Sequence, residues 1–286
     1  MIEYSSYSIV LTTYKPSNTF YELIESLYDI GDLKIYIVDS SPELDWLIIK
    51  NQIDLIISKN DCIIDLKYFH TENKGVPHSI NYGITKCIEN GIELFTIMDD
   101  DTSVIPQNFK TKEIVNFFNK FLNPEKDLLI LADGKSRKKI DAWVDTGLTF
   151  TKSLFNKTRF REEFVMDQTD IEFCKVVLRN NGKIVMYPEK VLFNKPVGSE
   201  SMNEVNILPA WRIYTLTRSV LIMWIEGNIG LYNILYNTLL FFKGLMFGRK
   251  KLSYLMAFLY GAIDGLNHDL GVTANLNKLS NNRFKL

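Results

Sequence analysis

The stretch Leu94-Phe95-Thr96-Ile97-Met98-Asp99-Asp100-Asp101 runs from a mostly apolar segment directly into three carboxylates. A short apolar run of this kind is typical of a buried strand. Carboxylates at the end of such a strand face the crevice beyond the carboxyl edge of an open α/β sheet, where these sheets bind ligands. Three adjacent negative charges repel one another unless a cation binds them. The stretch therefore predicts an α/β fold with a Mg²⁺ or Mn²⁺ site at this strand end, and a solvated acidic turn is the alternative.

Short apolar runs alternate with helix-like segments on both sides of this stretch. We expect strands at residues 8–12, 34–38, 66–69, 94–98, 128–131, 146–151 and 183–186. We expect helices, from the spacing of apolar residues, at 19–29, 78–90, 111–121 and 169–180. This alternation favours βαβ units and a mostly parallel, Rossmann-like central sheet flanked by helices.

The C-terminal part of the chain, from residue 209 to 264, is helical in pattern, aromatic and apolar. Between residues 219 and 242 the only charged residue is Glu226. A membrane span needs about 20 apolar residues, but glycines and asparagines interrupt this segment, and polar amides are costly inside a bilayer. We expect helices that lie on a membrane surface or contact a second copy of the chain, with Lys243 and residues 249–251 near anionic headgroups. Packing within the protein alone and a true span are the alternatives.

The bulk composition narrows the class of protein. The 286 residues are 46 % hydrophobic, which is enough to bury a large core. With 33 basic and 34 acidic residues the formal net charge is −1, so no overall basic field points to nucleic acid. The three cysteines form no CxxC pair and suit a reducing compartment. The N-terminus lacks the pattern of a secretory signal, so we expect a cytoplasmic protein.

Five polar segments mark the expected strand ends and the start of one helix. They are Thr12-Thr13-Tyr14, Val38-Asp39-Ser40-Ser41, Asn73-Lys74-Gly75, Asp99-Asp100-Asp101-Thr102 and Asp167-Gln168-Thr169-Asp170-Ile171-Glu172-Phe173. A parallel sheet brings the first four to one edge. This ordered set, over residues 8–218, resembles the inverting family 2 glycosyltransferases of GT-A fold. Within that family it is most similar to the rhamnosyltransferases and galactofuranosyltransferases of surface-polysaccharide assembly.

The resemblance implies a GT-A fold with a C-terminal helical extension. Residues 1–206 would form the catalytic domain, with a nucleotide-sugar half to about residue 105 and an acceptor half after it. Residues 207–286 would contact a membrane surface or another copy of the chain. The implied reaction moves a sugar from a nucleoside diphosphate sugar, a UDP- or dTDP-sugar, to a hydroxyl of a glycan or lipid-linked acceptor, at the inner face of the cell membrane.

The resemblance also assigns donor-binding residues. Thr12 and Tyr14 would line the donor site after the first strand, and Asp39 would accept a hydrogen bond from the nucleotide base. Asn73 and Gly75 would let the backbone pass close to the nucleotide, since glycine carries no Cβ. Without the resemblance, Asn73-Lys74-Gly75 would be an ordinary turn.

The family's Asp-x-Asp motif falls on Asp99 and Asp101. Both would serve the divalent metal, with Asp99 also facing the ribose or sugar and Asp101 as the main ligand. The metal would act as a Lewis acid that neutralises charge on the leaving diphosphate. Asp100, the variable middle residue, is expected only to be solvated.

The acceptor side is assigned to the acidic segment and to the stretch before it. Asp170 would be the general base, a role that typically contributes about 10²–10⁴ in rate. Asp167 and Glu172 would bind the acceptor, although carboxylates at a helix start are also favoured by the helix dipole. Trp143 would border the acceptor sugar, and a buried core tryptophan is the alternative.

The chain departs from the family pattern at two positions. Lys195 stands where the family often has a metal-binding histidine, and an ammonium group cannot ligate a metal but can pair with the diphosphate. Arg218 precedes Ser219 where the family has Arg-Asn. Arg218 would contact a phosphate of the donor or of a lipid diphosphate acceptor, or else pair with a surface carboxylate.

Two other functions remain open from the sequence. The change at Lys195 motivates a GT-A-like binding or scaffold subunit that is catalytically weak. A sugar-phosphate nucleotidyltransferase would also use an open α/β sheet with carboxylate-bound Mg²⁺. Such enzymes usually carry a Gly-rich loop near the first strand, whereas residues 11–17 contain no glycine.

Overall fold

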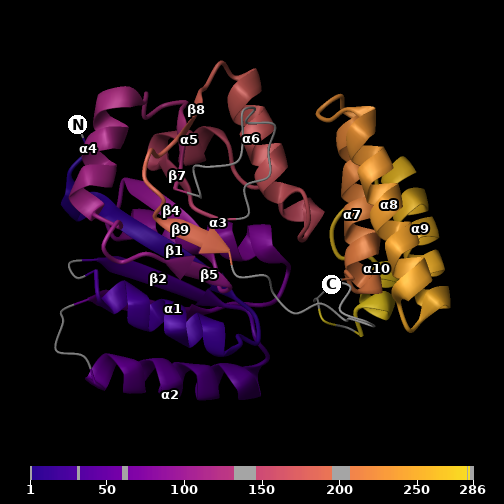
Figure 1. Cartoon of the computed structure of the whole chain (residues 1–286), viewed down its shortest axis with the longest axis horizontal. Coiled ribbons are helices and arrows are strands. Elements are labelled where there is room, and N and C mark those ends of the chain that lie inside the picture. Colours follow the sequence, from indigo (N-terminus) through magenta and orange to yellow (C-terminus); the bar gives the residue numbers. More distant parts are fainter. Residues whose placement is uncertain are drawn as a thin grey trace. The chain divides into compact units, whose positions relative to one another are not determined.

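The chain forms two compact units in a computed structural model that describes residues 2–30, 33–59, 64–131, 146–194, 207–281 and 283 (Figure 1). The first, here called the sheet unit, comprises Met1–Glu72, Ser79–Phe160 and Phe173–Pro196. The second, the helical unit, comprises Asn73–His78, Arg161–Glu172 and Val197–Leu286. Two short segments that the sequence groups with the strand-rich part therefore cluster with the C-terminal helices.

The sheet unit is built on a seven-stranded mixed sheet in the order β3-β2-β1-β4-β7-β6-β8. Its strands are β1 Tyr7–Thr13, β2 Lys34–Asp39, β3 Asp65–His70, β4 Leu94–Asp99, β6 Leu128–Ile130, β7 Leu148–Thr151 and β8 Ile184–Met186. Among these strands, β7 alone runs antiparallel to its neighbours β4 and β6. The predicted mostly parallel α/β sheet is confirmed. A separate antiparallel pair joins β5 Thr102–Val104 to β9 Leu192–Asn194.

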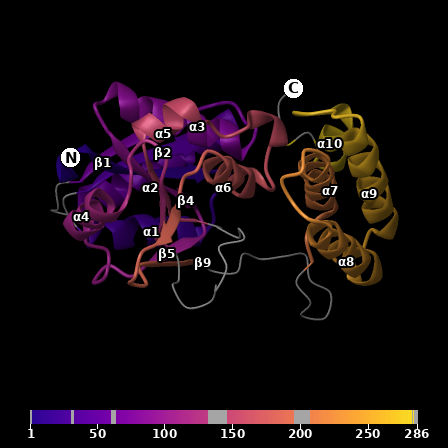
Figure 2. The ribbon, with the colours of Figure 1, turned by 90° about the horizontal axis from the view of Figure 1, so that it is seen from above.

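Helices cover both faces of the sheet. Successive side chains of a strand point to opposite faces, and every residue of β1 is buried, so both faces of this strand need a cover. Ile9 and Leu11 share one core with α1 Asn18–Tyr28, α2 Glu43–Lys59 and α4 Thr111–Phe121. The other face holds α3 Val76–Glu89 and α5 Lys152–Lys157, opposite α1 and α4 in Figure 2.

The close packing of α3 on the sheet depends on one glycine. A Cβ on Gly83 would lie 2.7 Å from Val10 Cγ1 and 2.8 Å from Val38 Cγ2. Real Cβ atoms do not approach other carbons so closely, so a larger residue here would push the helix off the strands. Gly83 thereby fixes the distance between α3 and β1.

Helix α2 is absent from the sequence prediction. Its buried residues Ile49, Ile53 and Ile56 follow helical spacing, and Glu43 and Asp45 lie in its first turn, where the helix dipole favours acids. The signal is weakened because Leu44, Leu47, Ile48 and Leu55 are exposed, so apolar residues lie on several faces of the helix.

The helical unit contains α7 Ala210–Ile225, α8 Leu231–Phe247, α9 Lys251–Leu266 and α10 Ala274–Leu279. Helix α9 packs tightly on α7 because Cβ atoms on Gly261 and Gly265 would lie 2.6 Å from the Tyr214 carbonyl and 3.0 Å from the Arg218 carbonyl. The predicted C-terminal helical extension is confirmed. Of the helices in the described ranges, none combines the length and the apolar character that crossing a membrane requires.

Candidate functional site

The carboxyl ends of three neighbouring strands meet at one edge of the sheet unit. In the strand register Thr12 is paired with Asp99 of β4, and Thr13 is paired with Asp39 of β2. Thr12 is nearly buried, and Tyr14, just past the strand, is half-buried. The expectation that a parallel sheet brings these segments together is confirmed for β1, β2 and β4.

The three aspartates Asp99, Asp100 and Asp101 at the end of β4 are half-buried, and hydroxyl groups contact two of them. Thr13 Oγ1 donates to Asp100 Oδ2 at 2.7 Å, so Asp100 is oriented by β1 rather than only solvated, as the sequence had suggested. The backbone N–H of Asp99 donates to Thr146 Oγ1 at 3.3 Å, and Thr146 also shares a hydrogen bond with Thr102 at 2.8 Å. A hydroxyl orients a carboxylate without adding a charge of its own.

Asp39 does not present its carboxylate to a ligand in this structure. The side chain has no exposed surface. Its Oδ1 accepts from the Ser41 backbone N–H at 2.7 Å, and its Oδ2 accepts from the Tyr68 hydroxyl. Burial and this hydrogen bond raise the pKa of Tyr68 far above its usual range, so Tyr68 stays a donor. Asp39 closes the turn after β2 in this way, and its contact with a base stays a prediction.

An aromatic group beside Asp39 was missed by the sequence reasoning. The ring of Trp46 stacks with Tyr68 at 6.4 Å and with His70 at 5.3 Å between centroids. His70 Nε2 lies 2.8 Å from the Ser41 carbonyl. These residues come from α2 and the edge strand β3, which are distant in sequence, and His70 is exposed. The group offers a flat apolar surface next to the strand ends.

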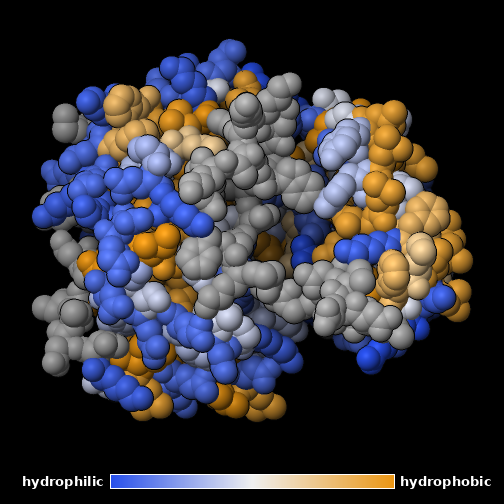
Figure 3. All heavy atoms as spheres, in the orientation of Figure 1, coloured by the Kyte–Doolittle hydropathy of each residue, from blue (hydrophilic) through white to orange (hydrophobic). Residues whose placement is uncertain are grey.

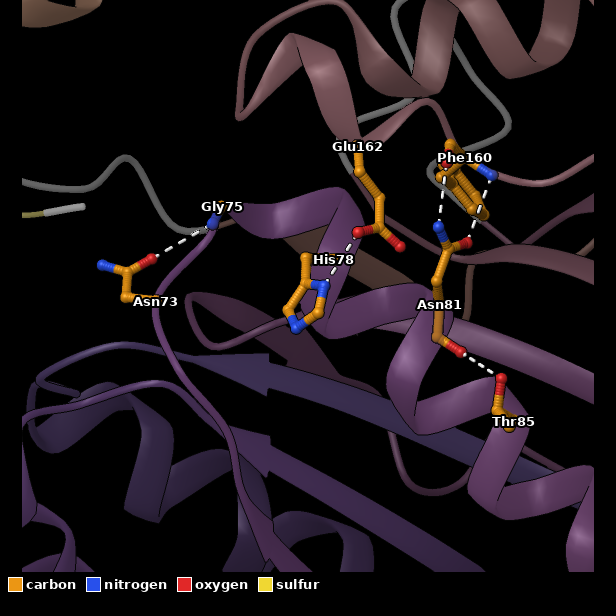
Figure 4. A network of polar contacts seen from close by, with 7 residues as sticks. All are labelled: Asn73, Gly75, His78, Asn81, Thr85, Phe160 and Glu162. Atoms are coloured by element: carbon orange, nitrogen blue, oxygen red, sulfur yellow. Dashed lines mark hydrogen bonds and ion pairs between the residues drawn. The ribbon is translucent and has the colours of Figure 1, made fainter. Parts of the chain in front are cut away.

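In the helical unit, Gly75 is required by the chain itself. It has φ +109°, and a Cβ on it would lie 2.1 Å from the Val165 carbonyl oxygen. The next residue, Val76, donates its backbone N–H to the same oxygen at 2.8 Å. Asn73 Oδ1 accepts from the Gly75 N–H at 3.3 Å, and Asn73 Nδ2 donates to the Arg283 carbonyl (Figure 4). Gly75 therefore allows a close approach to the Val165 backbone, and its approach to a nucleotide stays a prediction.

Two polar contacts of α3 were not anticipated (Figure 4). His78 Nδ1 and Glu162 Oε2 lie 2.8 Å apart in the helical unit. In the sheet unit the Asn81 side chain donates to the Phe160 carbonyl at 2.9 Å and accepts from its N–H at 3.2 Å. The amide of Asn81 thus replaces the backbone partner that Phe160 lacks at a chain bend.

The acidic segment is tied into the helical unit by arginines. Arg212 Nη2 donates to Asp167 Oδ1 at 2.7 Å, and the Thr215 hydroxyl donates to Asp167 Oδ2. Glu172 is almost fully buried, with Arg161 at 3.9 Å, and Arg161 also makes two bonds to Glu226 at 2.8 and 3.0 Å. Both carboxylates therefore serve internal ion pairs, and their acceptor contacts stay predictions.

Asp170 lies between these two acids in the sequence. It is the second residue of α6, which runs over Thr169–Arg179, and its side chain is half-buried. Gln168, two positions earlier, has φ +73°, a left-handed conformation that turns the chain sharply into the helix. The helix start and its dipole favour the ionised form of a carboxylate at this position.

Arg218, expected at a phosphate, is fully buried in α7. Its guanidinium donates to the carbonyls of Gly271 at 2.7 Å and of Glu163 and Phe164 at 3.4 Å. Burial lowers the pKa of Arg218. Arg218 therefore joins the segment around Glu163 to Gly271 through their carbonyls, and its contact with a phosphate stays a prediction.

The remaining predicted residues cannot be placed. Trp143 and Lys195 lie outside the described residues. Within the described ranges no three His, Cys, Asp or Glu side chains converge as a metal-binding group. Carboxylate oxygens of the kind found at Asp99 and Asp101 nevertheless suit Mg²⁺ or Mn²⁺, which often bind through one or two carboxylates and take their other ligands from water and substrate phosphates.

This chain is similar to known proteins in its structure, whereas comparisons of its sequence find no match. No protein-family model and no curated protein sequence matches the chain. The structure of the mannosyltransferase PcManGT from Pyrobaculum calidifontis, in complex with GDP-Man and Mn²⁺, is similar with a TM-score of 0.53 and 14 % identity, covering 96 % of this chain and 79 % of that one. At this identity the similarity concerns the fold, and it confirms the predicted GT-A-like class.

Two further solved structures are more distant. A putative nucleotide-diphospho-sugar transferase from Desulfovibrio desulfuricans has a TM-score of 0.37 and 10 % identity over 64 % of this chain and 79 % of that one. Mouse xyloside xylosyltransferase 1 has a TM-score of 0.33 and 10 % identity over 60 % of this chain and 71 % of that one. Neither is similar enough to support an argument about the site.

Proposed function

We propose that this protein transfers a sugar from a nucleoside diphosphate sugar to a hydroxyl of a glycan or lipid-linked acceptor at the inner face of the cell membrane. One observation carries the proposal. The half-buried carboxylates Asp99–Asp101 lie at the strand-end edge of a fold shared with a mannosyltransferase that was solved with GDP-Man and Mn²⁺. This edge is where open α/β sheets bind their ligands.

A divalent metal fits the donor atoms at this edge. Asp99 and Asp101 would supply carboxylate oxygens, and the diphosphate of the donor would complete the shell. When bound, the metal neutralises charge that develops on the leaving diphosphate. Lys195, if near this edge, would pair with the same diphosphate as a point charge.

The nucleotide base would rest on the aromatic group of Trp46 and His70. Asp39 is closed off by Ser41 and Tyr68, so recognition of the base falls to the neighbouring rings. A flat ring stacks on any base. This surface therefore accounts for nucleotide binding without specifying which base is bound.

Asp170 would act as the general base. It would take the proton of the acceptor hydroxyl while that oxygen bonds to the anomeric carbon and the bond from this carbon to the diphosphate oxygen breaks. A single displacement of this kind inverts the anomeric configuration. Asp170 is half-buried in the first turn of α6, and this position supports it as the acid that works on a substrate.

A thermal-shift panel of UDP-, dTDP- and GDP-sugars, each with and without Mn²⁺, tests the proposal. A ligand that binds only the folded state stabilises it by RT ln(1 + [L]/Kd), so a true donor raises the Tm, and more so with Mn²⁺. Absence of a shift with every nucleotide sugar contradicts the proposal. The nucleotide sugar that raises the Tm is then incubated with the protein, and the nucleoside diphosphate released by its hydrolysis is measured to test for cleavage of the donor.

A GT-A-like binding subunit without transfer is the second candidate. It is favoured by the number of expected ligand contacts, at Gly75, Asp167, Glu172 and Arg218, that the chain uses to hold itself together. Donor binding with no hydrolysis or transfer by the wild-type protein would select this candidate. Turnover that is lost in Asp170→Asn with binding retained would exclude it.

A further inference from the structure

Helices α8 and α9 each expose a continuous stripe of large apolar side chains. Each member of the two stripes is 40–71 % exposed. The α8 stripe is Leu231, Tyr232, Leu235, Leu239, Phe242 and Met246, and the α9 stripe is Leu252, Leu255, Leu259, Ile263 and Leu266. The spacing of three and four residues keeps each stripe on one side of its helix. Figure 3 shows hydrophobic side chains gathered where Figure 1 draws these two helices.

The opposite sides of the same helices are occupied within the helical unit. Asn237 and Phe241 of α8 and Tyr254 and Ala257 of α9 are buried. The phenol ring of Tyr254 fills the space beside Gly244, where a Cβ would lie 2.4 Å from the ring. Each helix therefore has one apolar side in the core and a second apolar side exposed. Exposed apolar side chains that lie next to one another in this number mark an interaction site.

The exposed charge on this surface has a single sign. Between Gly227 and Asn267 the only charged residues are Lys243, Arg249, Lys250, Lys251 and Asp264. Asp264 is buried and accepts hydrogen bonds from Tyr214, Thr273 and Asn275. The remaining four charges are basic, and three of them are exposed: Arg249 and Lys250 in the turn between α8 and α9, and Lys251 at the start of α9.

We propose that this surface, the two apolar stripes together with Arg249, Lys250 and Lys251, binds the face of an anionic lipid bilayer. A helix with an apolar side and basic neighbours lies in the membrane interface, with its apolar side chains among the acyl chains and its cations at the headgroups. A dimer through this surface would pair the surface with itself, and between Gly227 and Asn267 the only acidic residue, Asp264, is buried, so the basic residues favour an anionic lipid partner. The proposal stands apart from sugar transfer, since it rests on no residue of the strand-end edge.

Co-sedimentation of the full chain with vesicles tests the proposal. Binding to mixed phosphatidylcholine–phosphatidylglycerol vesicles is expected, with much weaker binding to phosphatidylcholine alone and loss of binding at high salt. Each basic residue near an anionic surface contributes roughly fivefold, so Arg249→Glu/Lys250→Glu/Lys251→Glu should lower the partition coefficient by roughly 100-fold or more. All three positions are exposed, so the variant keeps its fold.

A matched charge control separates this surface from the net charge of the protein. Lys110→Glu/Lys112→Glu/Lys120→Glu makes the same change in charge at exposed positions on or next to α4 and should keep vesicle binding. Leu239→Ser/Leu259→Ser removes one apolar residue from each stripe and should weaken binding about tenfold or more, since each buried side chain contributes favourably. Thermal shift with the donor sugar is expected to be unchanged in all three variants.

Three results would overturn the proposal. The first is no binding of the wild-type chain to the anionic vesicles. The second is equal loss of binding in the α4 charge control. The third is a dimer in sedimentation velocity that Leu239→Ser/Leu259→Ser dissociates, which would make the surface an interface between copies. Loss of nucleotide-sugar binding would count against the proposed function and not against this surface.

Discussion

The sheet unit and the helical unit use the same kinds of polar residue for opposite purposes. At the end of β4 the carboxylate of Asp100 accepts a hydrogen bond from the hydroxyl of Thr13, a contact that orients it without adding a positive charge. In the acidic segment, Asp167 faces Arg212 and Glu172 faces Arg161, and these arginines add positive charge next to the carboxylates. The difference teaches that the partner packed against a carboxylate, and not the motif alone, decides what the carboxylate can do.

Asp39 is the exception within the sheet unit. It lies at a strand end like Asp99, but it is buried and its two oxygens accept from Ser41 and Tyr68. Its position one strand further from β4, next to the aromatic residues of β3, decides this, because Tyr68 can reach it. The two units therefore differ in which groups contact their carboxylates, and not in the sequence motifs that contain them.

The largest effect is expected in the acidic segment itself. Asp170→Asn should lower the transfer rate by about 10²–10⁴, since it removes the proposed base. Donor binding and the free energy of unfolding should stay unchanged. Steady-state transfer rates and urea unfolding measure the two quantities.

Asp167→Asn is the matched control for that experiment. It should lower the free energy of unfolding by about 1–3 kcal/mol, because Arg212 loses its charged acceptor, and it should affect the rate much less. Equal losses of rate in the two variants, with both proteins equally stable, would erase the distinction between Asp170 and its neighbour.

The next effect tests the division of roles among the β4 aspartates. Asp101→Ala should lower turnover by roughly 100-fold, as expected when one preorganised electrostatic contact to the transition state is removed. It should also shift the Mn²⁺ requirement to higher concentration. Asp100→Ala should cost only about tenfold, because the residue orients the turn through Thr13. Equal activity in the two variants would refute the assignment.

Gly75 tests whether the helical unit needs its motif residues for folding. Gly75→Ala should destabilise the protein by about 3 kcal/mol, because the new Cβ would lie 2.1 Å from the Val165 oxygen. Gly91 has a similar positive φ of +77° but no atom within 4 Å of its Cβ position, so Gly91→Ala should cost only about 1 kcal/mol. Urea unfolding separates the clash from the backbone strain, and equal losses would show that the contact with Val165 matters little.

The smallest effect concerns the aromatic group of the sheet unit. Trp46→Ala should raise the Kd for the donor about fivefold, equivalent to the loss of about 1 kcal/mol of base stacking. Leu47→Ala, at a neighbouring exposed position on α2, should leave the Kd unchanged. Isothermal titration with the nucleotide sugar measures both Kd values. An unchanged Kd in Trp46→Ala would show that the base does not stack on Trp46.

Much of the sheet unit was predictable because strands and helices leave periodic patterns. The expected segments 34–38 and 94–98 are contained in β2 and β4, and helix 111–121 has the observed bounds of α4. Helix α2 was missed because its exposed leucines and isoleucine blur the periodicity. The meeting of Thr13, Asp39 and Asp99 at one edge followed from parallel pairing alone.

The roles of individual motif residues were not predictable in the same way. Gly75 was expected near a nucleotide and lies against Val165, and Arg218 was expected at a phosphate and holds three carbonyls. In both cases the partner is distant in the sequence. A motif indicates which chemistry a side chain can perform, but it does not indicate which group the side chain contacts in the folded protein.

The sequence by itself determined the α/β class, a mostly parallel sheet and the presence of an apolar helical C-terminal region, because these depend on local periodicity and on where strands end. The tertiary structure alone decided which carboxylates are neutralised, which glycine the backbone requires, and which side of α8 and α9 is exposed. Those outcomes depend on long-range contacts, such as Asp167 with Arg212 and Gly75 with Val165, that arise only when distant segments pack together.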